Sequence, residues 1–234
     1  MKLPVLYEDN HLLVVVKPAN LPVNLDESAD EDLLSLLKGY LKEKYHKPGN
    51  VYLGLVHRLD RPVGGVMVFA RTSKAASRLA RAMQSGGFAK SYLAVGCGKA
   101  AEEKQLRDYL TKDPGTNTSR VTDEKNGKLA VLSYRLLEYR DPLSLLKVDL
   151  QTGRSHQIRV QLSHDGLPLW GDQRYNPDAR IGQQIALFAC SLSFPHPITG
   201  QLLTFSARPE AREPWIRFDI ERLCNESEKE EIQL

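Results

Sequence analysis

The sequence has few cysteines and no long apolar run, and both shortages limit what the chain can be. The three cysteines, Cys97, Cys190 and Cys224, lie far apart and form no CxxC pair. This spacing argues against a disulfide framework or a structural zinc site and suits a reducing compartment. The longest stretch without Asp, Glu, Lys or Arg, residues 181–207, holds prolines, glutamines and a histidine that a membrane span would not tolerate. We therefore expect a soluble, cytoplasmic protein with no membrane partner.

Several motifs that carry familiar chemistries are also missing. The chain has no GxxxxGK[ST], no GxGxxG after a strand, no GxSxG and no HExxH. Its six histidines show no metal-ligand spacing with one another or with the cysteines. The sequence therefore lacks the usual signs of nucleotide hydrolysis, of a serine-triad hydrolase and of zinc catalysis. We expect neither a cofactor nor a metal.

The charge is unevenly distributed along the chain. The net charge is +3, but the last ten residues carry four Glu and one Lys, which leaves a net charge of +6 on residues 1–224. We expect one folded body over 1–224, followed by a mobile acidic tail over 225–234. Residues 57–92 hold seven basic residues against one acid, Asp60. Such a stripe is typical of a surface that binds a polyanion. A solvated helix face is the alternative, because Lys74, Arg78 and Arg81 lie at helical spacing.

The apolar pattern predicts many strands and few helices. Amphipathic or capped segments predict helices over 30–44, from Thr72 or Ser73 to Gln84, and over 156–163. Short apolar or β-branched runs predict strands over 11–16, 51–56, 66–70, 91–95, 130–139, 144–150, 185–194 and 202–206. Because strands and helices do not alternate regularly, we expect an α+β fold with a mixed sheet.

The segment HRLDRPVGGVMVFAR, residues 57–71, is the strongest candidate for chemistry. It places a single carboxylate, Asp60, between Arg58 and Arg61 in a loop that joins two apolar strands, and such loops often carry catalytic groups. An aspartate between arginines is expected to stay ionised, so it can act as a nucleophile or a base. Gly64-Gly65 allows a tight turn or the close approach of another backbone. The alternative is an Asp–Arg pair that only stabilises the turn.

HRLD followed by a glycine and an apolar strand resembles the signature of the RluA-like family of RNA pseudouridine synthases. Further blocks resemble the family in the same order, and together they cover roughly residues 7–207. They are YEDNHLLVVVKPANLPV (7–23), KSYLAV (90–95), LQTGRSHQIRVQLSHDGLPLWGDQRY (150–175) and LFACSLSFPHPITGQLLTFSA (187–207). Asn20 stands where the family has a glycine, and it too can adopt a left-handed conformation.

The resemblance implies a pseudouridine synthase fold: a largely antiparallel sheet with flanking helices and a central RNA-binding cleft. It also implies a monomeric enzyme that isomerises uridine to pseudouridine in rRNA or tRNA and needs no nucleotide cofactor. The first block begins at Tyr7, so we expect no S4-type RNA-binding module ahead of it. An RNA-binding protein that has lost activity, and an N-glycosidase that releases the base, are the alternatives.

The resemblance also assigns roles to individual residues. It implies that Asp60 is the essential carboxylate, that Arg159 pairs with it, and that Tyr92 lies at the target uracil. Arg58 either fills the gap left by the flipped nucleotide or only contacts a phosphate. Three further basic residues are expected to bind the RNA: Arg61, Lys90 and Arg154. We expect His57, His156 and Gln157 to be hydrogen-bonding scaffold residues.

Overall fold

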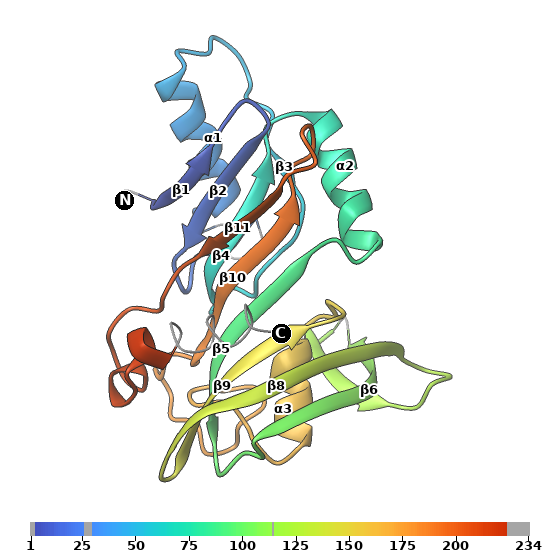
Figure 1. The fold of residues 1–234 in the computed structure, drawn as a ribbon, viewed down its shortest axis with the longest axis vertical. Coiled ribbons are helices and arrows are strands. Elements are labelled where there is room, and N and C mark those ends of the chain that lie inside the picture. Colours follow the sequence, from blue (N-terminus) through green and yellow to red (C-terminus); the bar gives the residue numbers. More distant parts are fainter. Residues whose placement is uncertain (1–2, 26–29, 114, 224–234) are drawn as a thin grey trace. The chain divides into compact units, whose positions relative to one another are not determined.

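The computed structural model describes residues 3–25, 30–113 and 115–223. The chain divides into two compact units, one formed by 1–90 with 189–207 and the other by 91–188 with 208–234. Each unit combines several strands with few helices, which confirms the α+β prediction (Figure 1). The predicted acidic tail, 225–234, lies outside the described residues. A single folded body over 1–224 stays a prediction.

The first unit is built on a sheet whose central strand is buried along its whole length. The strand order is β1 (Val5–Glu8), β2 (Leu12–Lys17), β4 (Gly64–Ala70) and β10 (Leu187–Pro195, from Ala189 on), with β3 (Gly54–Leu55) beside β4 and β11 (Leu202–Ser206) beside β10. The pairs β1–β2, β2–β4, β3–β4 and β10–β11 are antiparallel. All seven residues of β4 are buried, so this strand anchors the unit.

Helix α2 (Ser73–Gln84) covers one face of this sheet. Its first turn is capped by Thr72, whose Oγ1 accepts a hydrogen bond from the Ala75 amide at 3.1 Å. Ala75 and Leu79 on its inner side pack with Val66, Val68 and further apolar residues of β2, β4 and β10. The helix therefore begins and ends where the sequence predicts, and its charged side chains stay outside.

Helix α1 (Leu33–Lys44) begins three residues later than the sequence predicts. Asp32 is its cap: Oδ1 accepts a hydrogen bond from the Ser35 amide at 3.0 Å. Leu33, Leu37 and Leu41 form its buried stripe, as the periodicity predicts.

The second unit is a five-stranded antiparallel sheet with one helix packed on it. Its strand order is β5 (Ala89–Cys97, from Ser91 on), β9 (Leu143–Leu150), β8 (Lys128–Arg140), β6 (Glu103–Asp113) and β7 (Thr118–Thr122). All four neighbouring pairs are antiparallel. Val160 of helix α3 (Gln157–His164) packs on Leu110 and Ala130 of the sheet. A short 3₁₀ helix, η1 (Trp215–Arg217), follows the last strand.

Three parts of the strand prediction differ from the structure. Strand β1 was not predicted. The predicted strand 51–56 is reduced to Gly54–Leu55, which pairs with Ala70 and Phe69. The rest of that edge of β4 neighbours β10, so only the end of β4 can accept another strand. The hairpin of β6 and β7 was not predicted, because its sequence is rich in charged residues and has only Leu106 and Leu110 as a buried pair on β6.

No helix among the described residues is long and apolar enough to cross a membrane.

The step from the loop 57–63 into β4 depends on Gly65. Its φ is +134°, and a Cβ on this residue would lie 2.4 Å from the Ala189 carbonyl oxygen of β10. The close approach of a second backbone, which the Gly64-Gly65 pair predicted, is therefore confirmed at Gly65. Only glycine meets both the backbone angle and the packing at this point.

We predict that Gly65→Ala destabilises the protein by about 3 kcal/mol or more, because it adds backbone strain to a steric overlap. The free energy of unfolding from denaturant titration measures the effect. Gly39→Ala is the control. Gly39 lies inside α1, and a Cβ on this residue would meet no atom within 4 Å, so alanine should stabilise the helix by about 0.5–1 kcal/mol. Equal effects of the two substitutions would contradict the prediction.

Candidate active-site loop and the buried Arg159–Asp172 pair

The loop that carries Asp60 is tied to the end of β2 by a buried lysine. Lys17 is 0% exposed, although it carries an amine. Its Nζ donates hydrogen bonds to three carbonyl oxygens: Pro18 at 3.0 Å, Leu21 at 2.7 Å and Arg61 at 3.0 Å. An ammonium has three N–H donors, so the three acceptors satisfy it completely. The residue after Asp60 is thereby fixed to the turn that follows β2.

The electrostatics of Lys17 couple it to the same loop. Burial lowers the pKa of Lys17 to about 7; the negative charge of Asp60 opposes this shift and the positive charge of Arg61 adds to it. The Asp60 carbonyl in turn accepts a hydrogen bond from the Val63 amide at 3.0 Å, which closes a turn. Asn20, in the turn beside Lys17, has a φ of 66°, so the predicted left-handed conformation is confirmed. The backbone at and directly after Asp60 is therefore held in place.

His57 supports the loop from its other end. Its Nε2 accepts a hydrogen bond from the Val68 amide at 3.1 Å, and its ring meets the edge of Phe88 with 6.5 Å between ring centroids. Burial, and secondarily the positive charge of Lys90, lowers the pKa of His57 to about 3. The ring is therefore neutral and accepts a backbone hydrogen bond, as expected for a scaffold residue.

Three of the basic side chains predicted to bind RNA, Arg58, Arg61 and Lys90, have different surroundings. Arg58 is exposed, and among the residues that the structure describes nothing hydrogen-bonds its guanidinium. Arg61 forms an ion pair with Asp30, and both side chains are about half exposed. Lys90 is partly buried, with Nζ 3.5 Å from the Met83 sulfur, and burial lowers its pKa. Of the three, Arg58 is the most available to a ligand.

In the second unit, Arg159 is buried and forms a two-pronged ion pair with Asp172. Only 5% of Arg159 is exposed, so it is not a surface residue of α3. Its Nε and Nη2 donate to Asp172 Oδ2 at 2.8 Å and Oδ1 at 2.7 Å. The guanidinium carbon lies 5.1 Å from the centroid of the Tyr175 ring. These contacts fix the plane of the guanidinium.

Hydrogen bonds around the start of α3 position this arginine. His156, in a left-handed conformation, meets the Tyr175 hydroxyl with its Nδ1 at 2.7 Å. Gln157 is buried; its Oε1 accepts from the Arg154 amide at 2.9 Å, and its Nε2 donates to the Val131 carbonyl at 3.1 Å. Both residues therefore make the hydrogen bonds that were expected of them. Arg154 itself is exposed, and its Nε donates to the Leu129 carbonyl at 2.8 Å.

Tyr92 lies on β5, opposite Val148 of β9, and is 7% exposed. Asp60 belongs to the first unit, whereas Tyr92, Arg154 and Arg159 belong to the second. That these residues meet in one site stays a prediction.

Two residues of these networks, Lys17 and Asp172, were not singled out from the sequence. A signal existed for Lys17, because a lysine that directly follows the apolar run LLVVV is placed where burial is hard to avoid. Asp172 gave a weaker signal, since an aspartate after a glycine is also common in ordinary turns.

Within the described ranges, no group of three or more His, Cys, Asp or Glu side chains could hold a metal ion.

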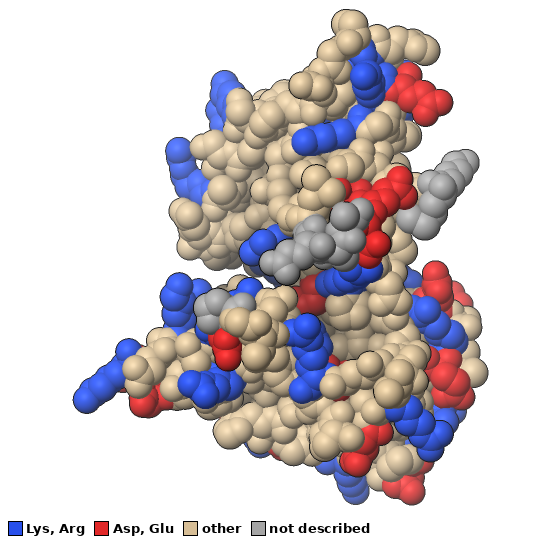
Figure 2. Space-filling model, turned by 180° about the vertical axis from the view of Figure 1, so that it is seen from behind, with Lys and Arg blue, Asp and Glu red and all other residues tan. Residues whose placement is uncertain are grey.

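The basic face of α2 is exposed, as either interpretation of the stripe requires. Lys74, Arg78 and Arg81 are all exposed, and Arg78 Nη1 donates to the Pro197 carbonyl at 2.7 Å. On the face of the molecule drawn in Figure 2, both basic and acidic side chains are exposed. Exposure alone does not decide between an RNA-binding and a solvated surface.

Comparison with known proteins assigns the family. A sequence model described as RNA pseudouridylate synthase matches residues 11–164, which include the Asp60 loop, β5 and α3. The chain therefore belongs to the RNA pseudouridylate synthase family.

Individual relatives agree with this assignment. The chain is 32% identical over 224 residues to ribosomal large subunit pseudouridine synthase D of Pasteurella multocida, covering 88% of this chain and 67% of the relative. It is 34% identical over 215 residues to the protein of the same name from Nitrosomonas europaea, covering 88% of this chain and 61% of the relative. An uncharacterized RNA pseudouridine synthase of Bacillus subtilis is 31% identical, with 95% of this chain and 72% of the relative covered. The chain thus spans only part of the length of these relatives.

Solved structures share the fold. Human RNA pseudouridylate synthase domain containing 1 superposes with a TM-score of 0.74 at 22% identity, covering 96% of this chain and 94% of the other. Human RNA pseudouridylate synthase domain containing 4 gives the same TM-score at 21% identity, covering 88% and 89%. At this identity the likeness supports the predicted pseudouridine synthase fold and nothing finer.

We predict that Lys17→Met destabilises the protein by at least about 2 kcal/mol, because three inward-facing carbonyls lose their donor. Chemical denaturation measures this loss, and Lys38→Met on α1 is the control that removes a lysine without removing such bonds. The difference should depend on pH. Between about pH 7 and pH 10.5 the folded wild type binds fewer protons than its unfolded chain. Its free energy of unfolding therefore increases with rising pH, relative to that of the variant. A difference that is independent of pH would contradict the low pKa of Lys17.

Proposed function

We propose that this protein isomerises uridine to pseudouridine at defined positions of a structured RNA, either rRNA or tRNA. The N1–C1′ glycosidic bond breaks, the uracil rotates, and C5 bonds to C1′; the proton leaves C5 and N1 ends protonated. Because no group is donated and no electrons are exchanged overall, the reaction needs no nucleotide cofactor. One carboxylate is enough to attack the sugar or to stabilise positive charge at C1′, as carboxylates do in glycoside cleavage.

The observation that carries this proposal is the family match over residues 11–164 around the Asp60 loop. In support, Lys17 and the turn to Val63 fix the backbone at and after Asp60, and His57 anchors the loop before it. A loop held in this way keeps its carboxylate in one orientation before substrate binds, which lowers the cost of reaching the transition state. Asp60 is the proposed catalytic carboxylate.

Arg159 is proposed to pair with Asp60 when the site is assembled. Asp172 holds Nε and Nη2 of Arg159, which fixes the plane in which the guanidinium can meet a carboxylate. Tyr92 is proposed to stack on the target uracil. Arg58, which is exposed, is proposed to support the flipped-out nucleotide or to contact a phosphate. Arg61, Lys90 and Arg154 are proposed to bind the RNA backbone in a central cleft.

The names of the relatives support one class of RNA substrate. Proteins named ribosomal large subunit pseudouridine synthase D are 32% and 34% identical to this chain, which supports rRNA as the substrate, and tRNA is the second candidate. A monomeric state and a cytoplasmic location belong to the same proposal, and the sparse, widely spaced cysteines support that location.

We predict that Asp60→Asn abolishes pseudouridine formation and leaves RNA affinity within a few-fold, because the amide keeps the shape of the side chain but cannot act as an anion. Carbodiimide mapping of RNA incubated with the purified protein measures the product, and filter binding measures affinity. Asp123→Asn is the control, since Asp123 only closes a surface turn with Asn126.

Each alternative activity gives a distinct result in the same assay. Free uracil released by the wild type would establish an N-glycosidase. RNA binding without any product, on rRNA and tRNA alike, would establish a binding protein. Substantial turnover by Asp60→Asn would remove Asp60 from its proposed role.

We predict that the exposed face of α2 contributes phosphate contacts. Replacing Lys74, Arg78 and Arg81 with Gln should flatten the slope of log K against log salt by roughly 2 to 3 units, at about 0.7 to 0.9 per phosphate. RNA binding measured over a salt series tests this. Replacing Lys38, Lys42 and Lys47, which lie on and after α1, removes the same charge and should leave the slope unchanged. Equal slopes for both triple variants would show that α2 is only solvated.

A further inference from the structure

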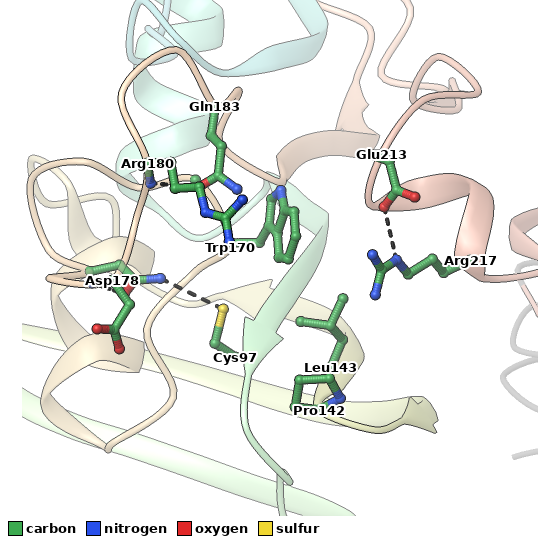
Figure 3. A pocket seen from close by; sticks show the side chains of 11 residues that line it. Cys97, Pro142, Leu143, Trp170, Asp178, Arg180, Gln183, Glu213 and Arg217 are labelled. Atoms are coloured by element: carbon green, nitrogen blue, oxygen red, sulfur yellow. Dashed lines mark hydrogen bonds and ion pairs between the residues drawn. The ribbon is translucent and has the colours of Figure 1, made fainter.

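The second unit contains a cavity of about 550 Å³ whose lining includes none of the predicted site residues. It lies between the loop after Leu169, the segment around η1 and the β8–β9 turn, as Figure 3 shows. Cavities of roughly 300–1,000 Å³ are typical of small-molecule sites. The size therefore allows one nucleotide, and the lining residues determine whether the chemistry also fits.

The cavity presents an aromatic ring, that of Trp170, on a backbone held by hydrogen bonds. The Trp170 amide donates to the Val95 carbonyl at 2.9 Å, and the Trp170 carbonyl accepts from the Ala186 amide at 2.9 Å. The next residue, Gly171, has a φ of +70° and packs on the Gln184 carbonyl. Trp170 stays partly exposed, with its backbone fixed on both sides. A partly exposed tryptophan on a fixed backbone is a platform on which a flat ring can stack.

Two arginines lie at the same cavity. Arg217 of η1 lies with its guanidinium carbon 5.5 Å from the Trp170 ring centroid, and its Nε donates to Glu213 Oε2 at 2.8 Å. Arg180 is exposed, and among the described residues no carboxylate pairs with its guanidinium. Arg180 therefore offers a positive charge that is free to bind an anion.

The loop that carries Arg180 is itself well ordered. The Gln183 amide donates to the Arg180 carbonyl at 3.1 Å, and the Arg180 amide donates to Gln183 Oε1 at 2.7 Å. Asn176, which is buried, ties the start of the loop down through Nδ2 to the Leu169 carbonyl at 2.9 Å. In the close view, the Arg180 and Gln183 side chains come from one loop, and Glu213 and Arg217 come from the other segment (Figure 3).

The charges of the lining select among anionic ligands. The two arginines are balanced by Asp178 and Glu213, so a bare polyanion gains little net attraction. A ligand with one phosphate, a flat ring and N–H donors uses all the groups: the phosphate pairs with Arg180, the ring stacks on Trp170, and the N–H edge faces a carboxylate. An RNA nucleotide with an amino or imino edge has this combination, and unpaired bases are commonly bound by stacking on aromatic and guanidinium planes.

We propose that this cavity binds one unpaired nucleotide of the substrate RNA, with its base stacked on Trp170 and its phosphate on Arg180. The proposal rests on the proposed function, because that function supplies RNA as the partner. The cavity would then hold the RNA at a second nucleotide, different from the uridine that is isomerised.

Mononucleotide binding tests the pocket without catalysis. The chain has two tryptophans, and Trp215→Phe leaves Trp170 as the sole fluorescent indole. In this background, AMP, GMP and CMP should quench the fluorescence in a saturable manner, and ribose 5-phosphate should do so far less. Arg180→Gln should weaken the binding about 10-fold or more, as expected for a lost charge-assisted hydrogen bond. Arg222→Gln, which removes a charge away from the cavity lining, is the matched control.

Catalysis on RNA gives the second measurement. Arg180→Gln and Trp170→Leu should raise KM for the RNA about 5-fold or more and change kcat less than 2-fold, while Trp170→Phe, which keeps a flat ring, should restore most of the affinity. Equal quenching by ribose 5-phosphate would overturn the proposal, since it would show an anion site without base recognition. Unchanged KM in both variants, or no quenching by any nucleotide, would overturn it as well.

Failure of the pocket can be told from failure of the proposed function. Asp60→Asn in the Trp215→Phe background should bind mononucleotides as well as its parent. Saturable binding without pseudouridine in any RNA would leave the pocket in place and reject the enzymatic activity. If pseudouridine forms and the pocket variants have an unchanged KM, the enzymatic activity stands and the proposed pocket is rejected.

Discussion

A buried ammonium holds the loop on which the proposed chemistry depends. Lys17 ends a strand of the first unit, and its three N–H donors reach carbonyls in the turn after that strand and in the Asp60 loop. Removing an amine from water is costly unless every donor finds an acceptor. The fold meets this condition by bringing both chain segments to the Lys17 amine. Because the Arg61 carbonyl must reach this amine, the position of the neighbouring Asp60 is restricted. This burial is also what lowers the pKa of Lys17.

The second unit uses a buried ion pair in a comparable way. Arg159 cannot turn freely, because Asp172 holds two of its nitrogens and Tyr175 covers its plane. A buried pair of this kind is weak support for stability, since desolvation offsets much of its attraction. Its geometric effect is stronger, because it also fixes the direction of the third nitrogen of the guanidinium. An arginine that has to orient a carboxylate needs this property more than it needs charge alone, and Lys in its place would not provide it.

The sequence predicted the elements whose own residues determine them. Helix α2 begins at a threonine cap and ends before two glycines, and Thr72 caps it in the structure. The β8–β9 hairpin turns at Asp141-Pro142, as predicted. The shortened β3 depends instead on which strand occupies the remaining edge of β4, and no local pattern encodes that competition. The hairpin of β6 and β7 escaped prediction for a similar reason, because its charged strands are held by pairing with β8 and by packing under α3.

The candidate site shows the same division between local and distant information. Asp60 was singled out from the sequence, because its segment resembles a family signature and places one carboxylate between arginines in an inter-strand loop. The partners that fix the machinery were not accessible: Lys17 is 44 residues from Arg61 along the chain, and Asp172 is 13 from Arg159. The proposed reaction depends on the orientation of a few side chains. The groups that provide this orientation are buried, are distant in sequence and make ordinary hydrogen bonds, so a structure is needed to find them.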